Sequence, residues 1–549
     1  MNLIHQFKNK IVLSLIMVFG LLGISTELND FEIAKNLEIF SNIYRELNTF
    51  YVDEVDPEHL METGVNAMLN SLDPYTTYIP ADEVAQFRST ITGKYGGVGA
   101  SILKGKEHII ISLPYENGPA QKAGLKVGDK MLEINGRSVV GASMRDISTQ
   151  MRGVPNSEVT IKVAREGVAK PLSFTLTREE INVTNTPYYG MLEDNTAYIV
   201  LNSFSENAGK NVANALTTLK ENHEVKGVIL DLRGNTGGLL TEAVNVANVF
   251  LDKGSMVVQI KGRDKATQQV FRTLNNPIDN EIPVCVLIDR SSASASEIVA
   301  GAIQDLDRGV IVGQRSYGKG LVQNTRNLSF GAKIKLTTAR YYIPSGRCIQ
   351  ALRYKNGKPE QIPDSLQASY ETMGGRTVYA GGGIKPDVFV DNTAFLKIMS
   401  TLNKDLYLFD FAAAYELKNK TIAKPSEFEL TDEDFEAFLM FLKERGYVYK
   451  TETEMLLEQL ETKAEKEAYA QVLASELEDI KEVLSTSGEE ELRKQKGRLM
   501  HLLQRYIVTR YYYEKGSLET GVRLDEEIKA AQTMLADKTI YEQILTPAK

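Results

Sequence analysis

Ser294, Lys319 and Gln323 are the residues whose types and spacing suggest catalytic chemistry in this chain. Ser294 lies in RSSASASEIVAGAIQDL, where small residues give way to apolar residues at helical spacing, so a helix is predicted to begin near Ser294. A serine at a strand-to-helix turn is exposed, and the N–H of Ala295 and the helix dipole face any oxyanion that forms there. Ser294 and Glu297 also fit a capping box, a structural role that is compatible with catalysis.

Lys319 stands in GQRSYGKG, which begins like a phosphate-binding loop. Such a loop needs a Ser or Thr after the lysine to bind Mg²⁺, and a helix that starts at the phosphates. Here Gly320 follows the lysine and GLVQNTR continues as a strand, so nucleotide binding is disfavoured. On that strand Lys319, Leu321 and Gln323 point the same way, and the Gln323 amide can accept a hydrogen bond from the ammonium.

A serine nucleophile needs a base, and histidine is the usual one. The chain has five histidines, at positions 5, 59, 108, 223 and 501, and only His223 is near the predicted core by sequence. A lysine can serve instead if burial lowers its pKa from about 10.4 towards about 7 to 8. The glycine-flanked, apolar setting of Lys319 permits such burial.

Residues 187–395 supply the elements that must position these side chains. Apolar runs such as GVILD and VCVLI alternate with helical patterns near residues 209–221, 239–251 and 295–306. This alternation, which includes the run SMVVQIKG, predicts an α/β core around a buried sheet. The stretch DLRGNTGG (231–238) follows one predicted strand, and taken alone it is equally well a tight strand-to-helix turn.

The rest of the chain divides into regions of different predicted secondary structure. Residues 26–85 read as short helices, 86–180 as β-rich runs that predict a small, partly open β-barrel, and 396–549 as charged amphipathic helices. At the N-terminus, Lys8 and Lys10 precede an uncharged stretch (11–24) that is shorter than a bilayer span and matches a secretory signal. Residues 1–25 are therefore expected to direct export, with an uncleaved anchor left open.

Composition narrows the classes of function. A chain of 549 residues is expected to form three or four domains, and a formal charge of -9 offers no basic field, so nucleic acid is disfavoured as a partner. The two cysteines, Cys285 and Cys348, give no disulfide framework and no C-x-x-C spacing, although the sequence leaves a bond between them open. No metal or other cofactor is expected.

SASASEIVAGAIQD followed by GKGLVQ resembles the signature of the carboxyl-terminal processing proteases, also called tail-specific proteases. DLRGNTGG, TARYYIPSGRCIQ, GGGIKPD and LDPYTTY occur as well, so the resemblance covers roughly residues 30–395. It implies a Ser/Lys dyad in which Ser294 is the nucleophile, Lys319 the base and Gln323 the residue that orients the lysine. It further implies that an N–H of Gly237 or its neighbour joins that of Ala295 as the oxyanion hole.

GPAQKAGLKVGDKMLEING, in the β-rich region, resembles a PDZ domain. The resemblance implies that a peptide C-terminus adds a strand to a sheet edge while backbone N–H groups around Gly96, Gly97, Val98 and Gly99 hold its carboxylate. A strand-entry turn that binds no ligand is the alternative.

These observations together predict a multidomain α/β protein: an α/β peptidase core with an inserted PDZ-like β-barrel domain, N-terminal helices and a C-terminal helical domain. The expected activity is that of a serine endopeptidase that recognises protein C-termini and processes or degrades exported proteins, in the periplasm or cell envelope. The alternative is a non-catalytic PDZ scaffold of the envelope. The sequence leaves open the physiological substrate, inner-membrane association through the N-terminal segment, homo-oligomer formation, and whether the PDZ domain activates or inhibits.

Overall fold

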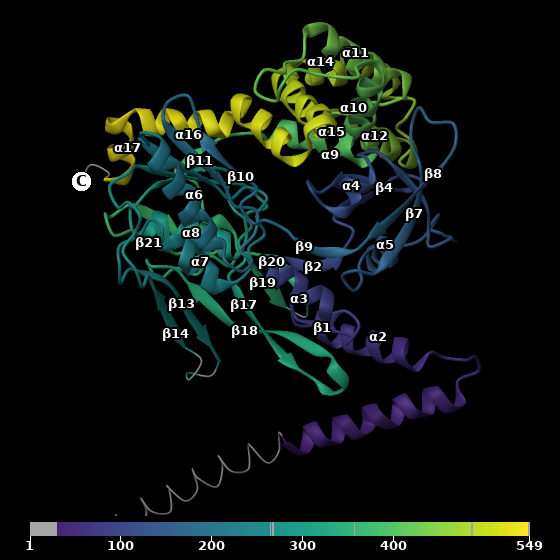
Figure 1. The fold of residues 1–549 in the computed structure, drawn as a ribbon. Coiled ribbons are helices and arrows are strands. Elements are labelled where there is room, and N and C mark those ends of the chain that lie inside the picture. The colour runs from purple at the N-terminus through teal and green to yellow at the C-terminus, as the bar shows by residue number, and fades with distance from the viewer. Residues whose placement is uncertain (1–29, 264, 266–267, 356, 485–486, 547–549) are drawn as a thin grey trace, which may run out of the picture. The chain divides into compact units, whose positions relative to one another are not determined.

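Figure 1 shows the fold of a computed structural model that describes residues 30–546 except 264, 266–267, 356 and 485–486. The predicted signal segment, residues 1–25, lies outside the described residues. The chain forms two compact units. The first contains the described part of residues 1–81 with 324–336 and 354–359, and the second contains the remainder.

The first unit is mainly helical, as predicted for this part of the chain. A helix covers residues 30–50, and α2 (Pro57–Asn70) follows, with Asp56 as its N-cap and a proline in its first turn. The short strand β1 (Thr77–Ile79) pairs with residues 333–335 of β18 (Lys333–Tyr342).

The α/β core of the second unit is built on one sheet with the order β10-β11-β12-β15-β16-β23. Its strands are β10 (Tyr188–Met191), β11 (Thr196–Val200), β12 (Gly227–Asp231), β15 (Val284–Ile288), β16 (Val310–Gly313) and β23 (Val388–Phe389). Only the pairing of β10 with β11 is antiparallel among the described strands of this sheet; the other pairings are parallel. Every residue of β12, β15 and β16 is buried, as their uninterrupted apolar runs predict for a sheet covered on both faces.

Different parts of the chain cover the two faces of this sheet. The helices α6 (Ala208–Asn222), α7 (Leu240–Ala247) and α8 (Ala295–Asp305) pack on one face, against residues such as Leu230 and Val286. The last helices, α16 (Glu526–Ala536) and α17 (Lys538–Leu545), pack on the other face, against Ile229 and Leu287. Helices α16 and α17 are therefore part of the core of the second unit.

The run SMVVQIKG does not join the core sheet as the sequence suggested. It forms β13 (Met256–Gly262), which pairs antiparallel with β14 (Gln269–Arg272) and with residues 339–342 of β18. Gln259 and Lys261 interrupt the apolar run, which is typical of an antiparallel strand with one solvated face. Four short strands, β19 (Leu352–Lys355), β20 (Lys358–Gln361), β21 (Ser369–Glu371) and β22 (Thr377–Tyr379), lie between β18 and β23 in sequence.

The β-rich region forms a domain around a sheet with the order β3-β4-β5-β7-β8, in which β6 pairs with β5. The strands are β3 (Ala100–Lys104), β4 (Ile109–Pro114), β5 (Lys130–Ile134), β6 (Arg137–Ser138), β7 (Glu158–Ala164) and β8 (Leu172–Thr177). The helices α3 (Val84–Thr92), α4 (Pro119–Ala123) and α5 (Met144–Met151) accompany it, and β2 (Lys94–Gly97) pairs with β9 (Glu179–Asn182). Strand β3 is at one end of the sheet order, so one of its edges is unpaired within that sheet.

The predicted C-terminal helices form a domain with its own core of buried aromatic and leucine side chains, among them Phe411, Phe438 and Leu503. The helices are α9 (Thr393–Lys404), α10 (Tyr407–Lys418), α11 (Asp432–Glu444), α12 (Glu452–Lys466), α13 (Ala474–Leu484), α14 (Ser487–Lys494) and α15 (Lys496–Leu524). Among the described residues, no helix combines the length and the apolar character that a bilayer span requires.

Candidate active site

The predicted catalytic residues follow three neighbouring parallel strands. Gly237 comes after β12, Ser294 after β15 and Lys319 after β16. These strands pair in that order, so the three loops emerge at the same edge of the sheet. The carboxyl ends of parallel strands are where open α/β sheets bind their ligands.

Ser294 is the N-cap of α8, as the sequence predicts. Its backbone has φ 57° and ψ -112°, a sparsely populated conformation for a residue with a side chain. Strained backbone of this kind is concentrated at functional sites. Ala295 is the first residue of α8, so its N–H has no acceptor within the helix and remains available for another acceptor.

Gly237 lies directly against the nucleophile candidate. A Cβ built on Gly237 would stand 2.8 Å from the Ser294 Cβ and 3.0 Å from the Ala295 nitrogen, and the φ of Gly237 is +103°. Only glycine fits this contact and this backbone conformation. The Gly237 N–H donates to Asn235 Oδ1 at 2.9 Å. In this conformation that N–H is engaged, and the oxyanion-hole role of Gly237 or its neighbour stays a prediction.

A buried carboxylate, that of Glu297, connects the loops of Ser294 and Lys319. Its Oε2 accepts hydrogen bonds from the backbone N–H groups of Ser294 and Lys319, each at 2.8 Å. Its Oε1 accepts from the Ser316 hydroxyl at 2.5 Å and from the Gly318 N–H at 2.7 Å. Because one oxygen binds both nitrogens, the backbones of Ser294 and Lys319 lie less than twice a hydrogen-bond length apart.

The environment of Glu297 also sets its ionisation. Burial raises the pKa of Glu297 to about 7, and the four donors oppose a larger rise because they favour the charged form. The sequence revealed only the helix-capping half of this role, the bond from the Ser294 N–H. The contacts to residues 316–319 depend on tertiary structure, which no local pattern reports.

Lys319 is half-buried, and the residue that follows it, Gly320, packs too closely against its neighbours to carry a side chain. A Cβ on Gly320 would lie 2.8 Å from the Gln350 nitrogen, and the Gly320 N–H donates to Gln350 Oε1 at 2.7 Å. The Lys319 carbonyl accepts a hydrogen bond from the Tyr341 hydroxyl. Strand β17 (Leu321–Asn327) follows the lysine where a phosphate-binding loop would have a helix, so that alternative lacks its structural basis.

Gln323 lies on β17, where its Nε2 donates to Thr337 Oγ1 at 3.3 Å. Lys319 precedes β17 and does not share the strand with Gln323, as the sequence had suggested, so the alternation of strand faces does not align the two side chains; their pairing stays a prediction. His223, the rival base, is exposed at the C-cap of α6, just before β12 begins. Ser294 follows the end of β15, which runs parallel to β12, so His223 lies at the opposite edge of the sheet.

The sequence left open a disulfide between the two cysteines. Cys285 and Cys348 are both free thiols, and Cys285 is buried in the core sheet. No group of three or more His, Cys, Asp or Glu side chains in the described part of the chain is arranged to hold a metal ion.

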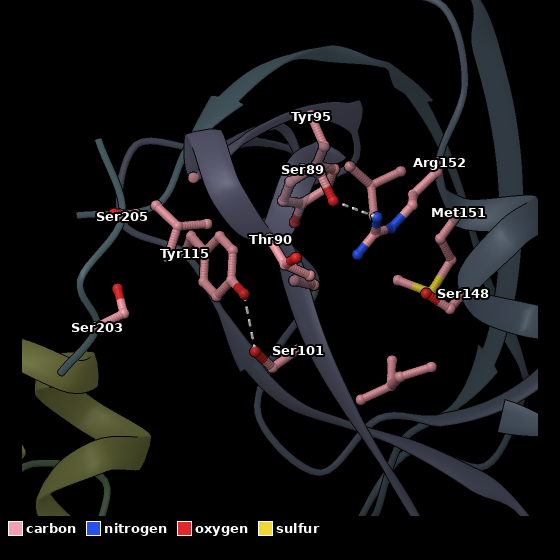
Figure 2. A pocket seen from close by; sticks show the side chains of 15 residues that line it. Ser89, Thr90, Tyr95, Ser101, Tyr115, Ser148, Met151, Arg152, Ser203 and Ser205 are labelled. Atoms are coloured by element: carbon pink, nitrogen blue, oxygen red, sulfur yellow. Dashed lines mark hydrogen bonds between the residues drawn. The ribbon is translucent and has the colours of Figure 1, made fainter. Parts of the chain in front are cut away.

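A second candidate site is a cavity of about 370 Å³ in the β-rich domain, shown in Figure 2. Its walls include Ala100 and Ile102 of β3, Ser148 and Met151 of α5, and Arg152. The unpaired edge strand therefore contributes to a cavity whose other wall is a helix, the arrangement that accepts an added peptide strand.

Arg152 supplies positive charge to this cavity, and the sequence did not indicate it. Its guanidinium lies 4.6 Å from the centre of the Tyr95 ring and donates to Ser89 Oγ at 2.9 Å. Burial is the largest cause of a raised pKa for the Tyr95 hydroxyl, so this tyrosine stays neutral near neutral pH. An arginine in a concave, partly apolar site can pair with a carboxylate.

The predicted carboxylate-binding glycines are placed at the same end of the domain. Gly96 and Gly97 belong to β2, paired with β9, and Gly97 also bridges to Arg152. The stretch between β2 and β3 is therefore only Val98 and Gly99, and Val98 lines the cavity. The ligand role of these four residues stays a prediction.

Comparison with known proteins assigns three regions of the chain to known families. Residues 195–356 match peptidase family S41, residues 110–165 match the PDZ domain, and residues 398–535 match the C-terminal helical domain of a probable PDZ-protease. The chain is 36% identical over 321 residues to the carboxy-terminal-processing protease of Bartonella bacilliformis. The aligned region covers 58% of this chain and 73% of that protein. It is 34% identical over 323 residues to the carboxy-terminal processing protease CtpB of Bacillus subtilis, covering 58% of this chain and 67% of that one.

Among solved structures, the photosystem II D1 C-terminal processing protease is 27% identical, with a TM-score of 0.36 over 65% of this chain and 93% of that one. The α/β core and its sequence match define a serine-type peptidase that carries a PDZ domain and a C-terminal helical domain. The chain belongs to peptidase family S41, the carboxy-terminal-processing proteases.

Proposed function

We propose that this peptidase cleaves with a Ser294/Lys319 dyad. The neutral Lys319 amine takes the proton from the Ser294 hydroxyl, and the alkoxide attacks the peptide carbonyl carbon. The N–H of Ala295, with that of Gly237 or its neighbour, stabilises the tetrahedral oxyanion. The lysine then passes its proton to the leaving amine, and a water molecule hydrolyses the acyl-serine ester while Lys319 again acts as base. Gln323 orients the lysine.

The observation that carries this proposal is the shared contact at Glu297. One carboxylate oxygen accepts hydrogen bonds from the N–H groups of both Ser294 and Lys319, so the proposed nucleophile and base share one anchor. Such an anchor provides the fixed geometry that proton transfer from the hydroxyl needs. The strained backbone of Ser294 supports the same assignment.

Active-site labelling and peptide hydrolysis test the dyad. Wild-type protein is expected to react with a fluorophosphonate at Ser294 and to cleave casein, whereas Ser294→Ala and Lys319→Ala variants with unchanged thermal unfolding lose cleavage. Full peptidase activity in purified Lys319→Ala would overturn the assignment. Peptide binding with no labelling and no cleavage in the wild type would favour the non-catalytic scaffold.

The PDZ domain is proposed to capture the free C-terminus of a protein substrate. The edge strand β3 offers backbone groups to an added strand, and Arg152 offers a cation for the terminal carboxylate. Amidating the C-terminus of a peptide, or changing Arg152→Gln, is expected to weaken binding by roughly tenfold, the loss of one charge-assisted contact. Arg145→Gln is the matched control, because Arg145 lies on α5, the helix that ends just before Arg152, but pairs with Glu83. Equal affinity for amidated and free peptides would contradict this role.

Export to the periplasm or cell envelope is proposed from the N-terminal segment, with exported proteins as substrates. Terminal sequencing of the protein recovered from an envelope fraction is expected to show cleavage near residues 23–25, or an intact anchor in the membrane fraction. Recovery of uncleaved protein from the cytosol alone would contradict export.

A further inference from the structure

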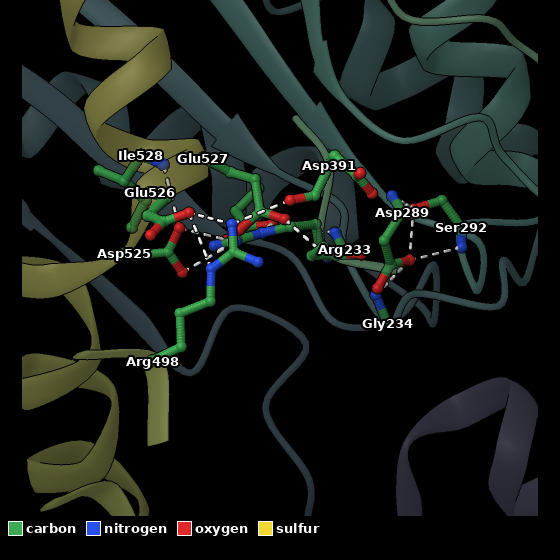
Figure 3. A network of polar contacts seen from close by, with 12 residues as sticks. Arg233, Gly234, Asp289, Ser292, Asp391, Arg498, Asp525, Glu526, Glu527 and Ile528 are labelled. Atoms are coloured by element: carbon green, nitrogen blue, oxygen red, sulfur yellow. Dashed lines mark hydrogen bonds and ion pairs between the residues drawn. The ribbon is translucent and has the colours of Figure 1, made fainter. Parts of the chain in front are cut away.

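Arg233 connects the peptidase core to the C-terminal helices. It lies in the loop after β12, and its guanidinium is bonded to three carboxylates, of which Figure 3 labels Asp525 and Glu527. Asp231 accepts from Nη2 at 2.6 Å, Asp525 accepts from Nη1 at 2.8 and 2.9 Å, and Glu527 accepts from Nη1 at 2.8 Å. Asp525 and Glu527 begin helix α16, which lies almost three hundred residues further along the chain.

This cluster of charged side chains is shielded from solvent. The side chain of Arg233 is 18% exposed, and those of Asp525 and Glu527 are 15% and 14% exposed. Burial opposes the charge of Arg233, but Asp231 and Asp525 outweigh it and raise the pKa of Arg233. Burial is also the largest cause that raises the pKa of Glu527 to about 7. Near neutral pH this carboxyl can therefore hold a proton, which reduces the excess of negative charge around Arg233. A buried charge that loses a partner is costly, so this contact holds its loop firmly.

The loop that Arg233 anchors leads to the active site within a few residues. Two positions on, the Asn235 carbonyl accepts from the Ala293 N–H at 3.1 Å and from Ser296 Oγ at 2.8 Å. The Asn235 side chain accepts from the Gly237 N–H. Residues 293 and 296 flank the nucleophile Ser294. The loop is therefore held by the C-terminal helices at one end and bonded to the nucleophile turn at the other.

A second connection reinforces the first. Asp289 Oδ1 accepts from the Gly234 N–H at 3.1 Å and from the Ser292 N–H at 3.0 Å. The Ser292 hydroxyl in turn donates to the Leu232 carbonyl at 2.8 Å. A displacement of Arg233 would therefore pass into the turn that precedes Ser294.

We propose that Asp525 and Glu527 are positioning residues for peptide hydrolysis: by holding Arg233 they fix the loop of residues 232–238 beside Ser294, so the C-terminal helical domain helps to set the geometry of the active site. The inference rests on the proposed role of Ser294. It assigns to these helices a part in turnover in addition to their part in folding.

Isosteric variants separate charge from shape. Asp525 is also the N-cap of α16, where its side chain accepts from the Ile528 N–H at 3.1 Å. Asparagine caps helices as well as aspartate, so Asp525→Asn removes the charge and keeps the cap. Combined with Glu527→Gln, it is expected to lower kcat on a fluorogenic peptide about tenfold or more, with KM within about twofold, because misplacement by an ångström costs up to about a hundredfold.

Glu526→Gln is the matched control, because Glu526 lies between the two acids in sequence but pairs with Arg498. Its kcat is expected to equal that of the wild type. The thermal unfolding midpoint of each variant is measured as well. A midpoint well above the assay temperature shows that a loss of kcat comes from a misplaced loop and not from unfolding. Unchanged kcat in Asp525→Asn/Glu527→Gln would overturn the inference.

A double-mutant cycle shows whether the acids act through Arg233. Arg233→Met is expected to lower kcat, and adding Asp525→Asn/Glu527→Gln to it should lower kcat no further. Independent, multiplicative losses would overturn the inference even if each variant is impaired. Rates of fluorophosphonate labelling at Ser294 distinguish a failure of the proposed function from a failure of this inference. A wild type that is not labelled contradicts the proposed function, whereas a labelled wild type matched by the Asp525/Glu527 variants contradicts only this inference.

Discussion

At the residue scale, Glu297 organises the candidate active site more than its sequence context suggests. A capping glutamate has to reach only one backbone N–H, whereas this one accepts four hydrogen bonds from two loops. Three of the donors are backbone N–H groups, which can only donate a hydrogen bond. Only an acceptor with two oxygens can satisfy them in a buried position.

Glu297→Gln tests this arrangement with almost no change of shape. In the glutamine, an NH2 group replaces one of the two carboxylate oxygens and faces the donors that this oxygen had bound. At least one backbone N–H therefore loses its acceptor. We expect a loss of about 1–3 kcal/mol in unfolding free energy. The Ser294 and Lys319 loops should also separate enough to lower kcat by roughly a hundredfold.

Denaturant unfolding and peptide hydrolysis measure the two effects of Glu297→Gln. Glu221→Gln, an exposed change at the end of α6, is the control and should alter neither. Wild-type kcat in Glu297→Gln would show that the shared carboxylate does not hold the catalytic geometry.

The raised pKa of Glu297 predicts how stability depends on pH. In the unfolded chain this carboxyl loses its proton near its ordinary value of 4.5, but in the folded protein only near about 7. The folded state therefore binds more protons over that interval, and its stability must fall as pH rises through it. Between about pH 5 and about pH 7.5, we expect the wild type to lose more unfolding free energy than Glu297→Gln, which lacks the titrating group. Parallel pH profiles for the two proteins would contradict this assignment.

At the scale of elements, the close approach of the Gly237 loop to the start of α8 is the feature that a single methyl group can test. Gly237→Ala places a Cβ at 2.8 Å from the Ser294 Cβ and forces a φ of +103° on a residue with a side chain. We expect about 2 kcal/mol or more of destabilisation and strongly reduced fluorophosphonate labelling, because the loop must move away from Ser294.

Gly234→Ala is the control for this substitution. Gly234 has a φ of +71° but no atom within 4 Å of a Cβ built on it, so the change adds backbone strain without a clash. Its cost should be about 1 kcal/mol, with labelling preserved. Equal labelling of Gly237→Ala and the wild type would separate this loop from the catalytic site.

Local sequence was sufficient to predict the elements that carry the site. The buried strands, the start of α8 at Ser294 and the strand after Lys319 were all predicted, because each depends on the periodicity or on the cap of a short stretch. The membership of β13 in a separate sheet was not, because an apolar run does not say which strand it will pair with.

Contacts between distant residues are what the sequence could not supply. Glu297 meets residues 316–319 only after β15 and β16 are paired, and Arg233 meets Asp525 across most of the chain. In sequence, the Asp525 segment looks like any charged helix face, because its acids are defined by partners that lie elsewhere. The family resemblance did not reveal these contacts either, since its motifs end before the C-terminal helices.

At the scale of the whole second unit, the C-terminal helical domain also contacts the PDZ domain. Phe409 of α10 packs with Ile110 and Val127 of the PDZ domain in one buried cluster. Arg510 of α15 stacks over Phe409 and is bonded to Glu416, and a Cβ on Gly128 would meet its guanidinium at 2.9 Å. The same helical domain thus touches the PDZ domain and, through Asp525, the loop beside Ser294.

Phe409→Ala tests whether this contact contributes to the delivery of substrate. Removing the ring should cost about 3 kcal/mol of stability and loosen the PDZ domain, which lowers the effective concentration of a captured peptide at the active site. We expect KM for a peptide with a free C-terminus to rise roughly tenfold. The rate of fluorophosphonate labelling, which needs no PDZ binding, should stay within about twofold, because Ser294 and its loops are untouched.

Phe438→Ala is the matched control, since Phe438 is fully buried in the core of the helical domain and belongs to a cluster without PDZ residues. It should lower the unfolding temperature by a similar amount and leave KM unchanged. If both variants raise KM equally, the effect comes from lost stability alone. If only Phe409→Ala raises KM, the contact between the helical and PDZ domains contributes to the proposed delivery of a bound C-terminus to Ser294.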